Sequence, residues 1–212
     1  MLAIERKNEI LNKLRIEQRV LVSQLASYYG VTEETIRRDL DKLEKEGFEV
    51  LFDGTSMHKW TGNTVDYVPE NGFIYVSAQY GGIGNLYTIK EYSDFIYRFE
   101  FAFTREGANN GVGVRTPMGV DAAYEGMEIQ ILDHDAPIYK NLREYQQHGS
   151  VYGIIPAKRV KFPPLGEWNK EEIRVQGDHI TVIVNGEIIL DGNIREACQG
   201  HNVSEDGSKR NP

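Results

Sequence analysis

The class of fold follows from the stretch Asp94-Phe-Ile-Tyr-Arg-Phe-Glu-Phe-Ala-Phe103, in which every second residue from Phe95 onward is aromatic. Successive side chains of a β-strand point to opposite faces, so all these rings share one face of the strand. A second stretch, His179–Asp191, predicts a hairpin, because Asn185-Gly186 between two apolar runs favours a type I′ turn. Both patterns indicate antiparallel β-structure.

Further short strands are expected on either side of these two stretches. They are predicted at 73–79, 85–90, 111–115, 126–133, 150–154 and 171–176. No helical periodicity separates them, which is typical of an antiparallel sandwich. The fold class is therefore predicted as mainly β, with 48–212 forming the sandwich.

The first 47 residues follow a different, helical period. Apolar residues recur at 10, 11 and 14, then at 25, 26 and 29, then at 36, 40 and 43. This spacing predicts three helices, at 2–15, 23–29 and 33–46. Ser23 and Thr32 stand where helix N-caps belong, and Gly30 lies where a tight turn between helices is needed.

Two short helices joined by a turn have the layout of a helix-turn-helix. The apolar stripe of the third helix leaves Thr35, Arg37 and Arg38 exposed near its start, where base edges and phosphates are met. An ordinary three-helix bundle with a solvated arginine pair would show the same spacing. The pattern alone leaves both interpretations open.

The charge of the chain restricts where nucleic acid could bind. The net charge is −8, yet residues 1–48 hold nine basic and nine acidic residues, so the whole excess lies beyond Phe48. An acidic segment is repelled by nucleic acid, so DNA contact is expected only from the N-terminal part. No membrane span or secretory signal is evident, and one cysteine excludes an internal disulfide, so a cytoplasmic location is expected.

The densest polar chemistry lies in Gly126-Met-Glu-Ile-Gln-Ile-Leu-Asp-His-Asp135. In a strand, Glu128 and Gln130 share a face, and Asp133 would join them only through a β-bulge. Paired carboxylates on a sheet face suit cleavage of a glycosidic bond, in which one acts as acid and the other as base or nucleophile. A solvated strand face with ordinary carboxylates is the competing interpretation.

The N-terminal residues resemble a known family of DNA-binding segments. The run Val22-Ser-Gln-Leu-Ala-Ser-Tyr-Tyr-Gly-Val-Thr-Glu-Glu-Thr-Ile-Arg-Arg-Asp-Leu-Asp-Lys-Leu-Glu44 is similar to the helix-turn-helix of DeoR-type transcription regulators. The resemblance implies that residues 1–47 form a DNA-binding domain that uses Thr35, Arg37 and Arg38. It ends before the β-wing and the sugar-phosphate sensor domain of that family.

The remainder resembles the 3-keto-disaccharide hydrolase domain family. The matching motifs include Val50-Leu-Phe-Asp-Gly-Thr-Ser-Met-His-Lys-Trp60, Asn109-Asn-Gly-Val-Gly-Val-Arg115, Glu128-Ile-Gln-Ile-Leu-Asp133, Gly149-Ser-Val-Tyr-Gly153 and Gly166-Glu-Trp-Asn169. The resemblance implies a concanavalin-like jelly roll over 48–212 with a concave sugar-binding face. Measured against it, the last strands of the domain are expected to be missing from the chain.

The same resemblance implies a substrate with a ketone at C3 of the sugar, which acidifies the C2 hydrogen. A base could remove that hydrogen, the glycosidic oxygen could leave C1, and water could add. The residues expected to serve are Glu128 and Asp133 as acid and base, Arg115 as enolate anchor, and Gln130, Trp168, Tyr152, Asn110 and His134 as substrate-binding side chains. No zinc spacing occurs, and neither a metal nor a cofactor is expected.

Three functions are compatible with these features. The first is a carbohydrate-cleaving enzyme carrying a DNA-binding segment. The second is a sugar-responsive regulator in which the sandwich only binds sugar, with two copies needed for a two-fold operator. The third is a fragmentary or unnatural fusion in which neither half informs the other.

Overall fold

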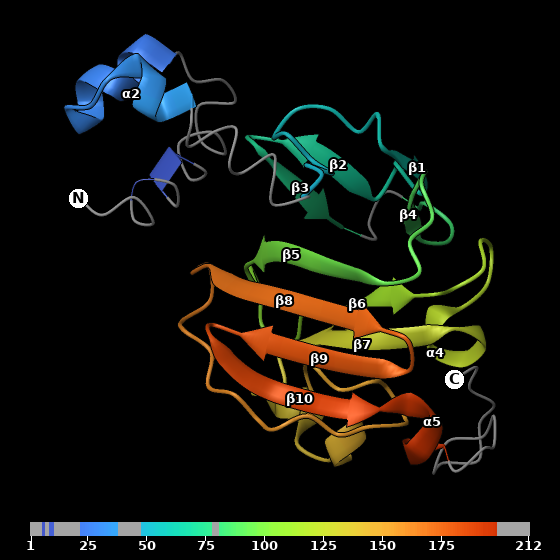
Figure 1. Ribbon diagram of the computed structural model, residues 1–212. Helices are drawn as coiled ribbons and strands as arrows, with labels where there is room; N and C mark the ends of the chain where they lie inside the picture. Colours follow the sequence, from blue (N-terminus) through green and yellow to red (C-terminus); the bar gives the residue numbers. More distant parts are fainter. Residues whose placement is uncertain (1–5, 7–8, 11–21, 38–47, 78–80, 199–212) are drawn as a thin grey trace. The chain divides into compact units, whose positions relative to one another are not determined.

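The computed structural model describes residues 6, 9–10, 22–37, 48–77 and 81–198. These residues fall into two compact parts, 1–90 and 91–212 (Figure 1). Antiparallel β-strands make up most of the regular secondary structure of the described residues, which confirms the predicted mainly β fold class.

The N-terminal residues that are described form the expected helix–turn–helix. Helix α2 spans Val22–Tyr29, Gly30 follows with a left-handed φ of 64°, and residues 33–37 are again helical. Thr32 caps the helix that begins at residue 33, because its Oγ1 accepts from the Thr35 backbone N–H at 3.2 Å. The N-cap prediction for Ser23 was wrong, since Ser23 lies inside α2. The remaining parts of the predicted helices 2–15 and 33–46 lie outside the described residues.

A small apolar core holds these helices. Its buried members are Ile10, Leu25, Ala26 and Ile36, all of which belong to the predicted apolar stripes. Burying an aliphatic side chain of this size contributes about 1.5–3 kcal/mol. The helical period therefore identified the residues that hold this segment together.

Two hairpin-like pairs follow between residues 60 and 88. Strands β1 (Trp60–Gly62) and β4 (Leu86–Thr88) pair with each other, and so do β2 (Tyr67–Glu70) and β3 (Phe73–Val76). Strands β3 and β4 lie within the predicted ranges 73–79 and 85–90, whereas β1 and β2 were not predicted.

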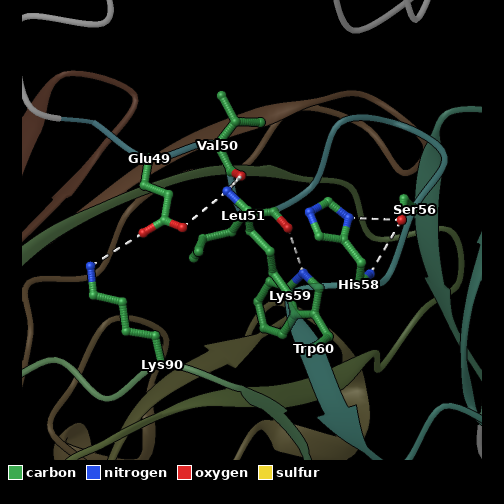
Figure 2. Close-up of polar contacts among 8 residues, drawn as sticks. All are labelled: Glu49, Val50, Leu51, Ser56, His58, Lys59, Trp60 and Lys90. Atoms are coloured by element: carbon green, nitrogen blue, oxygen red, sulfur yellow. Dashed lines mark hydrogen bonds and ion pairs between the residues drawn. The ribbon is translucent and has the colours of Figure 1, made fainter.

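Residues 49–51, which precede β1, are held by contacts with the side chains of Lys59, Trp60 and Lys90 (Figure 2). Glu49 forms ion pairs with Lys59 at 3.0 Å and with Lys90 at 3.4 Å. The Lys59 ammonium also donates to the Val50 carbonyl, and the Trp60 indole N–H donates to the Leu51 carbonyl, both at 2.8 Å. The chain is thus held against β1 from Glu49 onward.

The other part centres on a four-stranded antiparallel sheet in the order β10-β9-β8-β5 (Figure 1). Its strands are β5 (Phe95–Phe101), β8 (Asn169–Gln176), β9 (His179–Val184) and β10 (Glu187–Asn193). The predicted aromatic strand and the predicted hairpin are both confirmed. Asn185 and Gly186 have φ of 51° and 88°, the left-handed pair that a type I′ turn requires.

A two-stranded ribbon faces this sheet across the main core. Strand β6 (Asn109–Val114) pairs with β7 (Met127–Leu132). Met127 and Ile129 of the ribbon are buried in one cluster with Ile173 and Val182 of the four-stranded sheet. The result is two antiparallel layers packed face to face, as in a sandwich.

Residues 150–154 do not form the predicted strand. Val151 makes only isolated bridges, to Ile129 on one side and to Ile155 on the other. The short helices between the strands are α4 (Ala122–Glu125), η2 (Pro137–Tyr139), η3 (Glu144–Gln146) and α5 (Ile194–Ala197). The segment 150–154 therefore runs beside β7 as a loop, joined to it by backbone hydrogen bonds such as Gln130 N–H to the Ser150 carbonyl.

Candidate active site

The register of β6 and β7 sets the geometry of the candidate site. Glu128 lies opposite Gly113, and Gln130 lies opposite Gly111. Because partners in register share a face, Glu128 and Gln130 lie together on the face that turns away from the buried Met127 and Ile129. The prediction that these two polar side chains share a face is confirmed.

Tyr152 is brought to the same strand by backbone hydrogen bonds. Its N–H donates to the Glu128 carbonyl at 2.9 Å, and its hydroxyl accepts from Gln146 Nε2 at 2.9 Å. Gln130 donates from Nε2 to Asn109 Oδ1 at 2.9 Å and is only 5% exposed, whereas Glu128 is half-buried. Of the polar pair on this face, Glu128 is the side chain more open to solvent.

Asp133 lies past the end of β7 rather than on its polar face. The register runs without a shift from Met127 to Leu132, so the expected bulge is absent from this strand. The Asp133 carboxylate is buried and accepts from the Gly107 N–H at 2.9 Å, while its own N–H donates to the Ala108 carbonyl. In this structure Asp133 joins the strand end to the 107–108 turn.

His134 is buried beside Phe162, with ring centroids 4.9 Å apart. Its Nε2 lies 2.9 Å from the Val160 carbonyl, which can only accept, so Nε2 carries the proton. The other ring nitrogen, Nδ1, is buried without a partner. Burial is the main cause that lowers the pKa of His134, and it favours the neutral ring.

The other predicted site residues are held by different parts of the chain. Arg115 follows β6 in a left-handed conformation, φ 52°, and binds the Ser93 carbonyl and the Asp94 carboxylate at 3.0 and 3.2 Å. Asn110 is opposite Ile131 and so shares the core-side face of the ribbon, not the face of Glu128. Trp168 is 48% exposed just before β8. The structure thus brings together Glu128, Gln130 and Tyr152.

A buried histidine–carboxylate pair was missed at the sequence level. His148 and Glu171 are fully buried side chains whose Nε2 and Oε2 lie 3.1 Å apart. The His148 Nδ1 accepts from the Leu132 N–H at 3.1 Å, so the proton must lie on Nε2 and be donated to Glu171. The local signal that could have found the pair is weak, because Glu171 only replaces an apolar residue on the inward face of β8.

The surroundings of this pair are apolar and aromatic. Phe101, Phe103 and Phe162 contact the His148 ring, with centroids 5.1, 6.2 and 4.8 Å away. Burial raises the pKa of Glu171, and the hydrogen bond from His148 opposes that rise. Burial, assisted by the Glu171 charge, also raises the pKa of Tyr97 to about 12.

The candidate DNA-contact residues lie at the start of the helix that begins at residue 33. Thr35 is half-buried and exchanges a hydrogen bond with Thr32 through the two hydroxyls, which are 2.9 Å apart. Arg37 is exposed and pairs with Glu33 one turn earlier, at 2.6 Å. Arg38 lies outside the described residues.

Within the described residues, no cluster of three or more His, Cys, Asp or Glu side chains has the arrangement of a metal site. Likewise, none of the described helices has the length and apolar character of a membrane span.

Comparison with known families divides the chain at the same place as the sequence patterns. A family model for the 3-keto-alpha-glucoside-1,2-lyase-like domain matches residues 47–209, and one for the DeoR-like helix-turn-helix domain matches residues 6–51. Both resemblances seen in the sequence are confirmed.

Individual relatives agree with this division. A 3-keto-disaccharide hydrolase of Bacteroides thetaiotaomicron is 27% identical over 183 residues, which cover 70% of this chain and 59% of the relative. The uncharacterized HTH-type transcriptional regulator YulB of Bacillus subtilis is 50% identical over 46 residues, 22% of this chain and 18% of that protein.

A solved structure shares the fold. The crystal structure of a protein from Parabacteroides distasonis, proposed to be a glycosyl hydrolase, superimposes with a TM-score of 0.51 at 30% identity. The match covers 59% of this chain and 64% of that one. The predicted jelly-roll class of the β-domain is thereby supported by an experimental structure.

Proposed function

The chain belongs to the family of 3-keto-alpha-glucoside-1,2-lyase-like domains, and from this membership we propose that its β-domain cleaves the glycosidic bond of a 3-keto sugar. Glu128 acts as the base that removes the acidic C2 proton. The electron pair passes into the C3 enolate, which expels the glycosidic oxygen from C1. Water then adds across the C1–C2 double bond, and the leaving oxygen takes a proton.

The observation that carries this proposal is the placement of Glu128. It is a half-buried carboxylate on a rigid strand, on the same face as Gln130 and joined through its backbone to Tyr152. A base held on a regular element keeps its geometry during the reaction. Gln130 would read a sugar hydroxyl, and Tyr152 would pack against the ring.

The remaining roles follow from the family resemblance. Asp133 stays the predicted acid, although its carboxylate would have to leave the Gly107 N–H to reach a leaving group. Arg115 stays the predicted enolate anchor and would have to exchange its contact with Asp94. Trp168, Asn110 and His134 stay predicted substrate contacts on the basis of the resemblance.

The test incubates the full chain with a panel of 3-keto-glycosides and measures the release of the aglycone. Glu128→Gln is expected to lower kcat about 100-fold or more, the typical contribution of a general base. Glu125→Gln, which neutralises an exposed carboxylate at the end of the neighbouring α4, is the matched control and should keep full activity. Equal activity of both variants and the wild type would show that Glu128 is not the catalytic base.

A second function is proposed for residues 1–47, namely DNA binding through Thr35, Arg37 and Arg38. The capped helix that begins at residue 33 presents Arg37 as an exposed cation on its first turns, as major-groove readers require. A domain boundary at 47/48 is supported by Glu49, which already pairs with Lys59 and Lys90 (Figure 2). An operator with two-fold symmetry would be bound by two copies of the chain.

Titration of a duplex of random sequence at several salt concentrations tests this second function. Each phosphate contact contributes about 0.9 to the slope of log affinity against log salt, so Arg37→Ala should reduce the slope by about 1. Arg195→Ala, an exposed arginine paired with Asp178 in the β-domain, is the control that should leave the slope unchanged. Adding a 3-keto-glycoside then shows whether sugar binding alters DNA affinity.

A further inference from the structure

One face of the β6–β7 ribbon carries polar side chains from β7 and almost none from β6. Glu128 and Gln130 lie opposite Gly113 and Gly111, neither of which has a side chain. Asn109, at the start of β6, is the nearest residue of that strand to contribute one to this face. On this face, the β6 backbone at Gly111 and Gly113 is therefore not covered by side chains of its own strand.

Glu128 uses this opening. A methyl group placed on Gly111 would overlap the Glu128 carboxylate, with Oε1 nearest and with Cδ and Cγ both at 2.5 Å. All three of these nearest atoms belong to Glu128. The carboxylate thus lies across the β6 backbone in the space that any other residue at position 111 would fill.

The Gln130 side chain extends in the same direction, toward the start of β6. It reaches from its place opposite Gly111 to Asn109, two residues nearer the start of β6, and donates to Asn109 Oδ1 at 2.9 Å. Glu128 likewise reaches from its place opposite Gly113 to Gly111, two residues nearer the start of β6. The two side chains are therefore ordered in parallel, and neither is a freely rotating surface group.

Gly111 is not required by its own backbone. Its φ is not among the left-handed values found for other glycines, so alanine could adopt the same strand conformation. The closest overlaps that an added side chain would meet at this position are all with Glu128.

We infer that Gly111 is a positioning residue for Glu128, because the Glu128 carboxylate occupies the space that a side chain at position 111 would fill. The inference rests on the proposed function for its catalytic consequence, but the seating itself can be measured without turnover. Gly111→Ala would lift the carboxylate off β6 and move it relative to Gln130. A displacement of about 1 Å at a catalytic group can cost about 100-fold in rate.

The experiment compares Gly111→Ala with Gly113→Ala in the full chain. Gly113 lies on the same strand and face, yet the atoms nearest to a methyl group there belong to Ala122 and Thr116, at 3.2 Å and beyond. The first readout is the ¹³C resonance of the Glu128 carboxylate in glutamate-labelled protein. It should shift in Gly111→Ala and stay in place in Gly113→Ala, and an unmoved resonance in Gly111→Ala would overturn the inference.

A double-mutant cycle provides a readout of stability. The change in urea midpoint caused by Gly111→Ala should be less favourable in the wild-type background than in Glu128→Ala, because there the overlapping carboxylate is gone. The same change in both backgrounds would overturn the inference. This arm also holds if Gly111→Ala folds poorly by itself, since the double variant should then regain its fold.

Turnover of 3-keto-glycosides distinguishes the positioning role of Gly111 from the proposed function of the β-domain. Gly111→Ala should lose about 100-fold in kcat while Gly113→Ala keeps it. Equal loss in both variants would overturn the positioning role. An inactive wild-type chain would refute the proposed function, whereas the resonance and the cycle would still decide whether Gly111 seats Glu128.

Discussion

Replacing His148 by phenylalanine removes two hydrogen bonds from the core while keeping an aromatic ring among Phe101, Phe103 and Phe162. The Leu132 N–H loses its acceptor, and the Glu171 carboxylate loses its donor. An unsatisfied buried amide costs about 1–3 kcal/mol, and a hydrogen bond to a charged group contributes about 1.5–3 kcal/mol. We expect His148→Phe to lower the free energy of unfolding by about 3–5 kcal/mol, the range found when a buried pair loses one partner.

The exposed pair His179–Asp191 is the matched control. Its atoms are closer, at 2.7 Å, but both side chains are about half exposed, whereas His148 and Glu171 are fully buried. Exposed pairs contribute at most about 1 kcal/mol, so His179→Phe should change stability by no more than that. Urea denaturation of the three proteins at pH 7 measures the difference.

The loss in His148→Phe should also depend on pH. Removing His148 removes the bond that opposes the burial-raised pKa of Glu171, so this pKa rises further. A carboxyl group whose folded pKa exceeds its unfolded value loses stability as pH rises from about 4.5 through the folded pKa. The penalty should therefore be smaller at pH 5 than at pH 8. A penalty under 1 kcal/mol, or one equal to that of His179→Phe, would refute the assigned role of the buried pair.

The remaining predictions concern single carboxylates. Glu171→Gln cannot ionise, so its stability relative to the wild type should increase as pH rises above about 4.5, as measured by urea denaturation from pH 4 to 8; a difference that is flat with pH would contradict the burial-raised pKa. Asp53 accepts from the Ser56 and Thr55 N–H groups and from the Thr55 hydroxyl, which lower its pKa to about 2. NMR titration should find that midpoint, and Thr55→Val should raise it while leaving it below 3.8, because both backbone donors remain.

The local patterns of the sequence were sufficient for the strands with strong alternation. The aromatic period of β5 and the Asn185-Gly186 turn were identified because each depends on neighbouring residues only. The capping role of Thr32 was found for the same reason. Weak strands such as β1 and β2 are short and carry no clear alternation, so nothing local distinguished them.

The candidate site could be predicted only in part. Glu128 and Gln130 share a face because they are two residues apart on one strand, which the sequence alone implies. The bulge expected before Asp133 did not form, since the strand simply ends and the carboxylate binds Gly107, 26 residues away in the chain. Asn110 was predicted as a substrate contact but lies opposite Ile131 on the core-side face, because the register of β6 against β7 cannot be read from either strand alone.

The sequence by itself therefore determined the two kinds of domain, the strands of strong period and the polar face of β7. Only the tertiary structure decided that Gly111 lies beneath the Glu128 carboxylate and that His148 meets Glu171 across the core. The physical reason is the distance along the chain over which each interaction acts. Periodicity and turn preference act between neighbours, whereas strand register and the pairing of buried polar groups are settled when distant segments pack together.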